Sequence, residues 1–115
     1  MKWVQAAILG LMVALGVSVP TQARDAISDA RARDILTNAV NTGAPLFNQG
    51  DLVGCYTIYR GAILSVQTLV GDRPSLELAL ANALQQANAQ PSFADKAWTL
   101  RRAIDLALEE LRPPF

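Results

Sequence analysis

With 115 residues, the chain has room for a single domain. Its ten basic and ten acidic residues cancel and only 6% of its residues are aromatic, so we expect neither a basic surface for nucleic acid nor rings for stacking on bases. The absence of histidine and the presence of one cysteine remove the common zinc-ligand sets and the nucleophiles that a histidine activates.

Residues 1–23 have the pattern of a secretory signal peptide. Lys2 precedes the almost unbroken apolar run 3–19, Pro20 ends that run, and Thr21-Gln22-Ala23 supplies the small residues of a cleavage site. The alternative is an uncleaved membrane anchor, for which the run is short against a hydrocarbon core of about 30 Å. The pattern predicts a periplasmic or secreted protein whose mature domain covers residues 24–115.

The first helix of that domain is predicted over residues 25–42. Its apolar residues recur on one helical face: Ala32, Ile35, Leu36, Ala39 and Val40. Two alternatives stay open for its end. Either the helix ends at Gly43, a common C-terminal stop, or it kinks at Pro45 and continues to Gln49.

Three further helices are predicted, each with its own start signal. The second covers residues 52–70 and follows Asp51, which fits an N-cap. The third covers residues 75–89, directly after Pro74. The fourth follows the capping residue Ser92, and its apolar residues repeat at helical spacing: Phe93, Ala97, Leu100, Ile104, Ala107 and Leu111. Together they predict an all-α fold, either a four-helix bundle or two stacked helical hairpins.

Charged side chains on two of these helices have the spacing of surface ion pairs. Asp29 lies four residues before Arg33, and Asp105 is within reach of both Arg101 and Arg102. We expect both sets to lie on the outside of the bundle.

Cys55 is the single cysteine, so it has no partner for an intramolecular disulfide. An exposed thiol is a liability in an oxidising compartment, and we therefore expect Cys55 to be buried as a small apolar side chain. The alternatives are an intermolecular disulfide and a reactive thiol.

The stretch 43–62, GAPLFNQGDLVGCYTIYRGA, resembles the middle of a tetratricopeptide repeat. The residues that carry the resemblance are Gly43, Leu46, Gly50, Cys55, Tyr59 and Ala62. It implies a helical hairpin in which small residues allow close approach and Tyr59 fills the groove. Counting on by the repeat period of about 34 residues gives Leu84 and Lys96 where a glycine and an alanine belong, which indicates one unit rather than an array. The stretch is also similar to a family of small exported bacterial proteins of unknown function, which implies no activity.

The remaining polar residues do not predict catalysis. Ser92 and Lys96 have the spacing of a Ser–Lys pair, but the capping role explains Ser92 better. Glu109 and Glu110 are adjacent and point to different sides of a helix, so they do not converge on a metal ion. We therefore expect no catalytic residues, no metal and no cofactor, and we expect that the protein is not an enzyme.

Two functions remain. The first is a non-catalytic protein-interaction module with an unidentified protein partner, no nucleic acid, and contact with a membrane only through an uncleaved signal segment. Its predicted binding residues are Phe47, on the loop before the second helix, and Tyr56 and Arg60, because aromatic and arginine side chains are enriched at binding hot spots. The second is a small-molecule or lipid carrier with an apolar cavity between the helices, favoured by the 51% of hydrophobic residues. A cavity above about 300 Å³ would favour the carrier.

Overall fold

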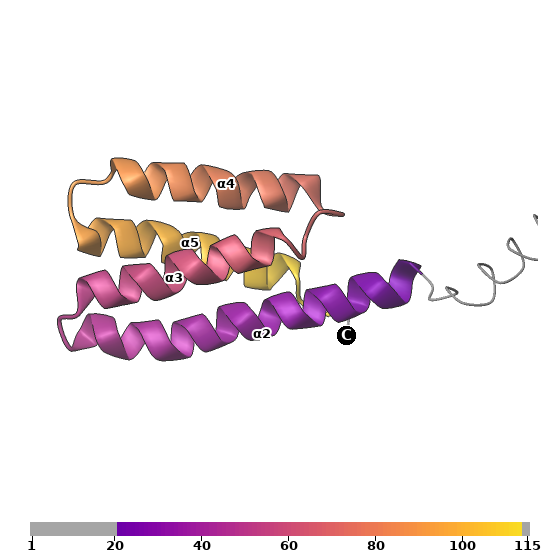
Figure 1. Ribbon diagram of the computed structural model, residues 1–115, viewed down its shortest axis with the longest axis horizontal. Coiled ribbons are helices and arrows are strands. Elements are labelled where there is room, and N and C mark those ends of the chain that lie inside the picture. The colour runs from indigo at the N-terminus through magenta and orange to yellow at the C-terminus, as the bar shows by residue number, and fades with distance from the viewer. Residues whose placement is uncertain (1–20, 114–115) are drawn as a thin grey trace, which may run out of the picture.

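The computed structural model describes residues 21–113, and this part of the chain forms four α-helices (Figure 1). Their bounds are α2 Thr21–Asn48, α3 Leu52–Gln67, α4 Pro74–Ala89 and α5 Phe93–Glu110. The all-α fold class is confirmed. Residues 1–20, the larger part of the predicted signal peptide, lie outside the described residues. None of the helices in the described range combines the length and the apolarity that a membrane span requires.

The helices pack as two hairpins. The most extensive contacts join α2 to α3 and α4 to α5, and contacts between α3 and α5 hold the two hairpins together. Figure 1 shows the four helices side by side, with the N-terminal end of α2 running past the other three. Short connections between antiparallel neighbours are what the sequence predicted.

Local capping interactions explain where α3, α4 and α5 begin. The Asp51 carboxylate accepts a hydrogen bond from the Gly54 amide at 2.9 Å, and the Ser92 hydroxyl accepts one from the Asp95 amide at 3.1 Å. Pro74 occupies the first turn of α4, where its missing N–H leaves no bond unmade. The predicted starts are therefore confirmed to within one residue.

The end of α2 follows the second of the two alternatives. The helix continues through Pro45 and ends at Asn48. Gly50 follows two residues later, and its φ of +90° lies in the left-handed region that glycine tolerates. There the Asp51 amide donates to the Leu46 carbonyl at 2.8 Å, closing the helix as in a Schellman motif. Phe47 consequently lies on the last turn of α2 and not on a loop, which corrects the sequence-based expectation.

The end of α3 and one ion pair also differ from expectation. α3 ends at Gln67 and not at residue 70, because the next two amides bond carbonyls three residues back and tighten the turn. The predicted pair of Asp29 with Arg33 does not form. Asp29 instead bonds Arg73, with Nη2 to Oδ2 at 2.7 Å, while Arg33 donates to the Leu111 carbonyl. Both replacements are contacts between segments distant in sequence, which spacing along one helix does not reveal.

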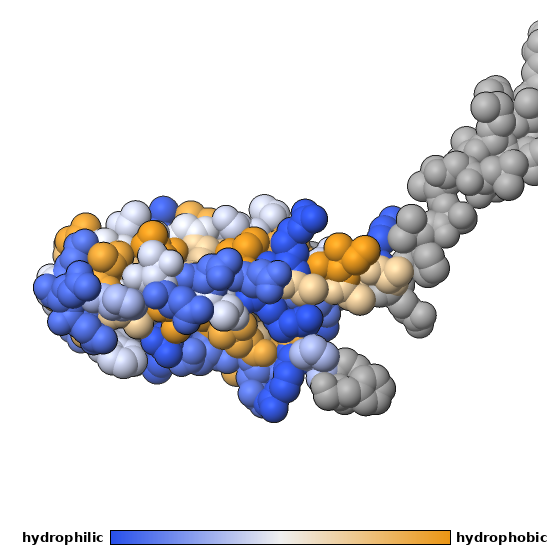
Figure 2. Space-filling model, turned by 90° about the horizontal axis from the view of Figure 1, so that it is seen from below, coloured by the Kyte–Doolittle hydropathy of each residue, from blue (hydrophilic) through white to orange (hydrophobic). Residues whose placement is uncertain are grey.

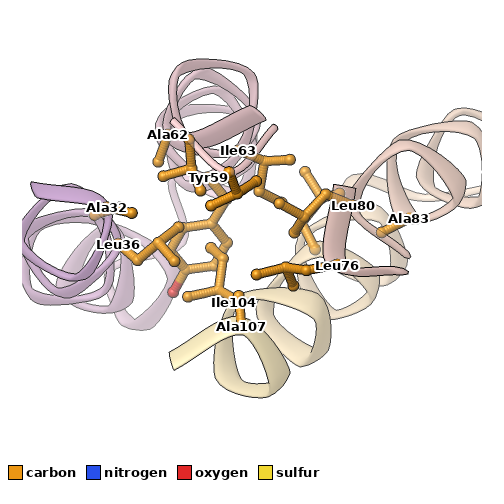
Figure 3. Close-up of a cluster of buried hydrophobic side chains, with 14 of the residues drawn as sticks. Ala32, Leu36, Tyr59, Ala62, Ile63, Leu76, Leu80, Ala83, Ile104 and Ala107 are labelled. Atoms are coloured by element: carbon orange, nitrogen blue, oxygen red, sulfur yellow. The ribbon is translucent and has the colours of Figure 1, made fainter. Parts of the chain in front are cut away.

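One hydrophobic core lies between the four helices (Figure 3). Every helix supplies fully buried side chains to it: Leu36 from α2, Ile63 from α3, Leu76 and Leu80 from α4, and Leu100 and Ile104 from α5. Each such side chain contributes about 1.5–3 kcal/mol relative to an exposed one. The core fixes the helix axes, and with them the surface features described next.

Candidate functional site

A surface cleft of about 190 Å³ lies between the C-terminal part of α2 and the N-terminal half of α5. Its lining residues are Ala44, Phe47 and Asn48 from α2, Tyr59 from α3, and Ala97, Trp98 and Arg101 from α5. The cleft exists because α2 and α5 contact each other less than either contacts α3, and because Ala44 and Ala97 place methyl groups where larger side chains would meet.

Two aromatic rings form one wall of the cleft. The Phe47 and Trp98 ring centroids are 5.8 Å apart and the ring planes meet at 72°, the edge-to-face geometry that aromatic pairs prefer. Trp98 remains 49% exposed, since it points away from the apolar stripe of α5 that faces the core. A large aromatic side chain therefore packs against Phe47 and keeps about half of its surface in water.

Tyr59 forms the floor of the cleft. The residue is 2% exposed, and its hydroxyl points into the space between α2 and α5 (Figure 3). Burial, and next the hydrogen-bonding contact with the Cys55 thiol, raise the pKa of Tyr59, while Arg101 acts in the opposite direction. At neutral pH the floor therefore presents a neutral hydroxyl, which can donate a hydrogen bond.

Arg101 brings positive charge to the cleft. Its Nε donates to the Asp105 carboxylate at 3.1 Å, which confirms one of the predicted pairs, and its side chain lines the cleft next to Tyr59. Burial tends to lower the pKa of Arg101, but the contacts with Asp105 and Tyr59 outweigh it and the net shift is upward. The guanidinium is held in place and fully charged.

The three predicted binding residues lie in two different places. Phe47 belongs to the cleft. Tyr56 packs its ring against Phe93 of α5, with centroids 5.6 Å apart, and its hydroxyl donates to the Asn88 side chain at 3.3 Å. Arg60 is exposed one turn further along α3. Within the described part of the chain, no aromatic contact joins Phe47 to Tyr56.

Tyr56 and Arg60 share their flank of α3 with two exposed apolar side chains. Val53 and Leu64 follow the same three- and four-residue spacing, so the four residues form a stripe along one side of the helix. This stripe is partly apolar, but it is not hollowed. Figure 2 shows that the face of the molecule seen from below likewise mixes polar and apolar side chains in small separate patches.

Sequence reasoning missed Trp98, Arg101 and the second role of Tyr59. One signal was available, because Trp98 falls outside the apolar stripe of an amphipathic helix, where a large aromatic residue has no core to fill. No comparable signal marks Arg101, whose position in the cleft depends on how α5 packs against α2.

A second cleft, of about 170 Å³, lies near the N-terminal half of α2 and is lined by charged residues, among them Asp29, Arg33, Arg73 and Arg112. These cations are already engaged. Arg73 bonds Asp29, Arg33 donates to a main-chain carbonyl, and Arg112 bonds Glu109. The arginine side chains that line the second cleft are thus bonded to other groups of the same chain.

Cys55 is buried, as predicted, with 1% of its surface exposed. Burial raises the pKa of the thiol, and the hydrogen-bonding contact with Tyr59 partly offsets that rise. The thiol is therefore neutral at physiological pH and shielded from reagents. Among residues 21–113, no group of three or more cysteine or acidic side chains is arranged to hold a metal ion.

Comparisons of the chain with protein-family models, with curated proteins and with solved structures returned no match. The fold is that of a small four-helix domain, and no family is identified for it.

Proposed function

We propose that this chain is a non-catalytic, exported helical domain that binds a partner protein through the cleft between α2 and α5. The observation that carries the proposal is Trp98, which is half exposed at the mouth of a concave site and stands beside Phe47 and Arg101. Tryptophan and arginine side chains in or next to pockets dominate many binding hot spots. When a partner covers such a ring, the free energy of binding gains about 25 cal/mol per Å² of apolar surface removed from water.

Two further features favour an interaction module. The stretch 43–62 resembles a type of helical hairpin that commonly serves protein contact, and within it Gly43 packs closely against the Tyr59 ring. The chain also has no histidine, and its one thiol is buried and neutral, so the usual nucleophile–base pairs cannot be assembled from it.

The volume of the cleft favours the module over the carrier. Sites for small molecules usually measure about 300–1,000 Å³ and enclose most of the ligand. The cleft between α2 and α5 measures about 190 Å³ and is open to solvent. Between the described helices, leucine, isoleucine, valine and alanine side chains fill the core.

The proposal is tested by capture of partners from an envelope extract of the source organism. Full-length protein is immobilised, and bound proteins are compared between the wild type and the double variant Phe47→Ala/Trp98→Ala. The matched control is Leu78→Ala, which removes a side chain that is 62% exposed on α4 and lies away from the cleft. We expect a specific partner to be lost with the double variant and kept with the control, while circular dichroism shows unchanged helix content.

Tyr56 and Arg60 are tested in a separate arm of the same experiment. The variants Tyr56→Phe and Arg60→Ala leave the cleft intact, so loss of the partner with these variants alone would place the binding face on α3. Equal capture by every variant would argue against both faces. Turnover of a substrate by the purified protein, or a small molecule bound at a 1:1 ratio, would overturn the proposed function itself.

A further inference from the structure

We propose that the cleft receives an extended segment of the partner, which inserts one aromatic side chain beside Phe47 and Trp98 and places an adjacent Asp or Glu carboxylate against Arg101 and the Tyr59 hydroxyl. This inference rests on the proposed function and names the chemistry of the partner.

The size of the cleft sets the form of the occupant. A protein cavity of about 150 Å³ is large enough to bind benzene, so a cleft of about 190 Å³ holds one aromatic ring. An interface between two globular surfaces usually covers about 800 Å² on each partner, whereas the volume of this cleft, about 190 Å³, suffices for one side chain. The occupant is therefore a single side chain carried by a flexible or extended segment.

The walls determine which side chain fits. The edge-to-face pair of Phe47 and Trp98 leaves ring surface on Trp98 open to a third ring, and three-ring clusters of this kind keep favourable geometry. The methyl groups of Ala44 and Ala97 line the cleft along with the rings, and they provide a smooth apolar contact without competing polar atoms. An aromatic side chain gains contact on each of these surfaces.

The positive charge in the cleft determines which group of the partner lies next to the inserted ring. Among the described residues that line it, Arg101 is the one that is charged at neutral pH. Its ion-pair partner Asp105 lies outside the lining, and its side chain is 56% exposed, so water screens the pair. Arg101 bonds Asp105 through Nε and also makes a hydrogen-bonding contact with Tyr59, but the five N–H groups of the guanidinium still leave donors for a second carboxylate.

Tyr59 supplies a second hydrogen-bond donor at the end of the cleft where Arg101 lies. The residue is almost completely buried, yet it lines the cleft beside Arg101, where a ligand carboxylate can accept from the Tyr59 hydroxyl and from Arg101 together. The raised pKa of Tyr59 keeps that hydroxyl protonated through the neutral range. An aromatic side chain with an adjacent carboxylate thus complements both ends of the cleft.

The test uses full-length protein with Trp3→Phe, which leaves Trp98 as the single tryptophan. Its fluorescence is titrated with three peptides that are acetylated and amidated, so that they carry no terminal charges: Gly-Glu-Phe-Gly, Gly-Gln-Phe-Gly and Gly-Glu-Ala-Gly. We expect the Glu-Phe peptide to bind about 5- to 10-fold more tightly than the Gln-Phe peptide, which corresponds to about 1–1.4 kcal/mol, the usual net contribution of one hydrogen bond at a partly exposed site. We expect the Glu-Ala peptide to leave the emission unchanged.

Three variants assign the effect to the cleft. Arg101→Gln should make the Glu-Phe and Gln-Phe peptides bind equally, whereas the matched control Arg102→Gln, which changes the neighbouring exposed arginine, should preserve the difference. Ala44→Leu should fill the cleft and abolish binding of the Glu-Phe and Gln-Phe peptides while the melting temperature is retained.

The possible failures can be told apart from failure of the proposed function. Equal binding of the Glu-Phe and Gln-Phe peptides to the parent protein would show that the partner needs no carboxylate next to the inserted ring. If Trp98 emission stays unchanged with every peptide while partner capture still requires Trp98, then no such segment enters the cleft. The proposal of an interaction module would be unaffected by that result. Partner capture that does not require Trp98 would remove the cleft as the binding surface altogether.

Discussion

Gly43 shows how one missing side chain sets the distance between two helices. A Cβ atom at this position would lie 2.5 Å from Cε1 of the Tyr59 ring and within about 3.1 Å of two more ring atoms. Glycine therefore lets α2 approach α3 until the Tyr59 ring lies against its backbone. The same approach places the Tyr59 hydroxyl at the floor of the cleft.

Gly43→Ala should destabilise the protein by about 1–3 kcal/mol, the usual cost of overpacking a filled interior. This cost exceeds the gain of up to about 1 kcal/mol that alanine brings to a helix interior. Gly61→Ala is the matched control, because no atom lies within 4 Å of a Cβ at that position of α3, and it should raise stability by the helix gain alone. Urea unfolding of the three proteins measures both effects. Equal stabilisation by the two substitutions would show that the Tyr59 ring moves aside at no cost.

The burial of the Cys55 thiol makes the free energy of unfolding depend on pH in the alkaline range. Burial holds the pKa of the folded thiol above its ordinary value of 9.0, so the unfolded chain ionises first as the pH rises. The unfolded state then binds fewer protons than the folded state, and the free energy of unfolding falls with increasing pH. The stabilising contribution is complete below about pH 9 and is lost as the pH rises through the pKa of the folded thiol.

Cys55→Ser should lower the free energy of unfolding at pH 7 by about 1–3 kcal/mol, because it places a hydroxyl in an apolar interior. The variant should also lose less stability than the wild type between pH 8 and pH 10, since the titrating thiol is gone. Unfolding at the two pH values measures both quantities. Rapid reaction of the native wild type with a thiol reagent would contradict the burial on which the prediction depends.

The starts of α3, α4 and α5 could be predicted from the sequence because their signals are local, whereas α2 begins at residue 21 and not at residue 25 as predicted. Asp51 and Ser92 bond amides three residues ahead, and these contacts form within one turn whatever the rest of the chain does. The end of α2 could only be narrowed to two alternatives. Pro45 removes one helical hydrogen bond, but Leu46 and Phe47 pack on the core beyond it, and that tertiary packing carries the helix on to Asn48.

Ser92→Ala should destabilise the protein by about 1 kcal/mol, because the Asp95 amide loses its acceptor at the first turn of α5. Ser65→Ala is the control. The Ser65 hydroxyl donates to the Gly61 carbonyl on an exposed face within α3, a bond that adds little to helix stability. Chemical denaturation compares the two variants with the wild type. Loss of the same stability in both would mean that the cap makes no particular contribution.

The candidate site depends on how the helices pack in the folded protein, which explains why the sequence predicted it only in part. Phe47 was predicted, as an aromatic residue on a potential binding surface. Its partners Trp98 and Arg101 lie on the last helix, and the arrangement that brings them to Phe47 is the antiparallel contact of α2 with α5. Periodicity shows which face of each helix is apolar, but not which helix that face meets. The grouping of Phe47 with Tyr56 followed from their proximity in sequence, whereas the fold places them against different neighbours.

The predicted processing removes residues 1–23 from the chain. Helix α2 begins at Thr21, so cleavage after Ala23 would remove its first three residues. From residue 23 on, the first fully buried residue of α2 is Ala32, and the mature chain would keep it together with every other residue of the described core. Asp25 would then stand in the first turn, where a negative charge interacts favourably with the helix dipole.

Mass spectrometry of the exported protein should find Arg24 as the N-terminal residue. A protein that begins at Arg24 should unfold with a free energy within about 0.5 kcal/mol of one that begins at Thr21, the range usual for changes at exposed positions. Loss of the cooperative unfolding transition in the shorter protein would show that the first turn of α2 is required by the fold. Recovery of the chain from the membrane fraction with Met1 intact would instead identify the apolar segment as an anchor.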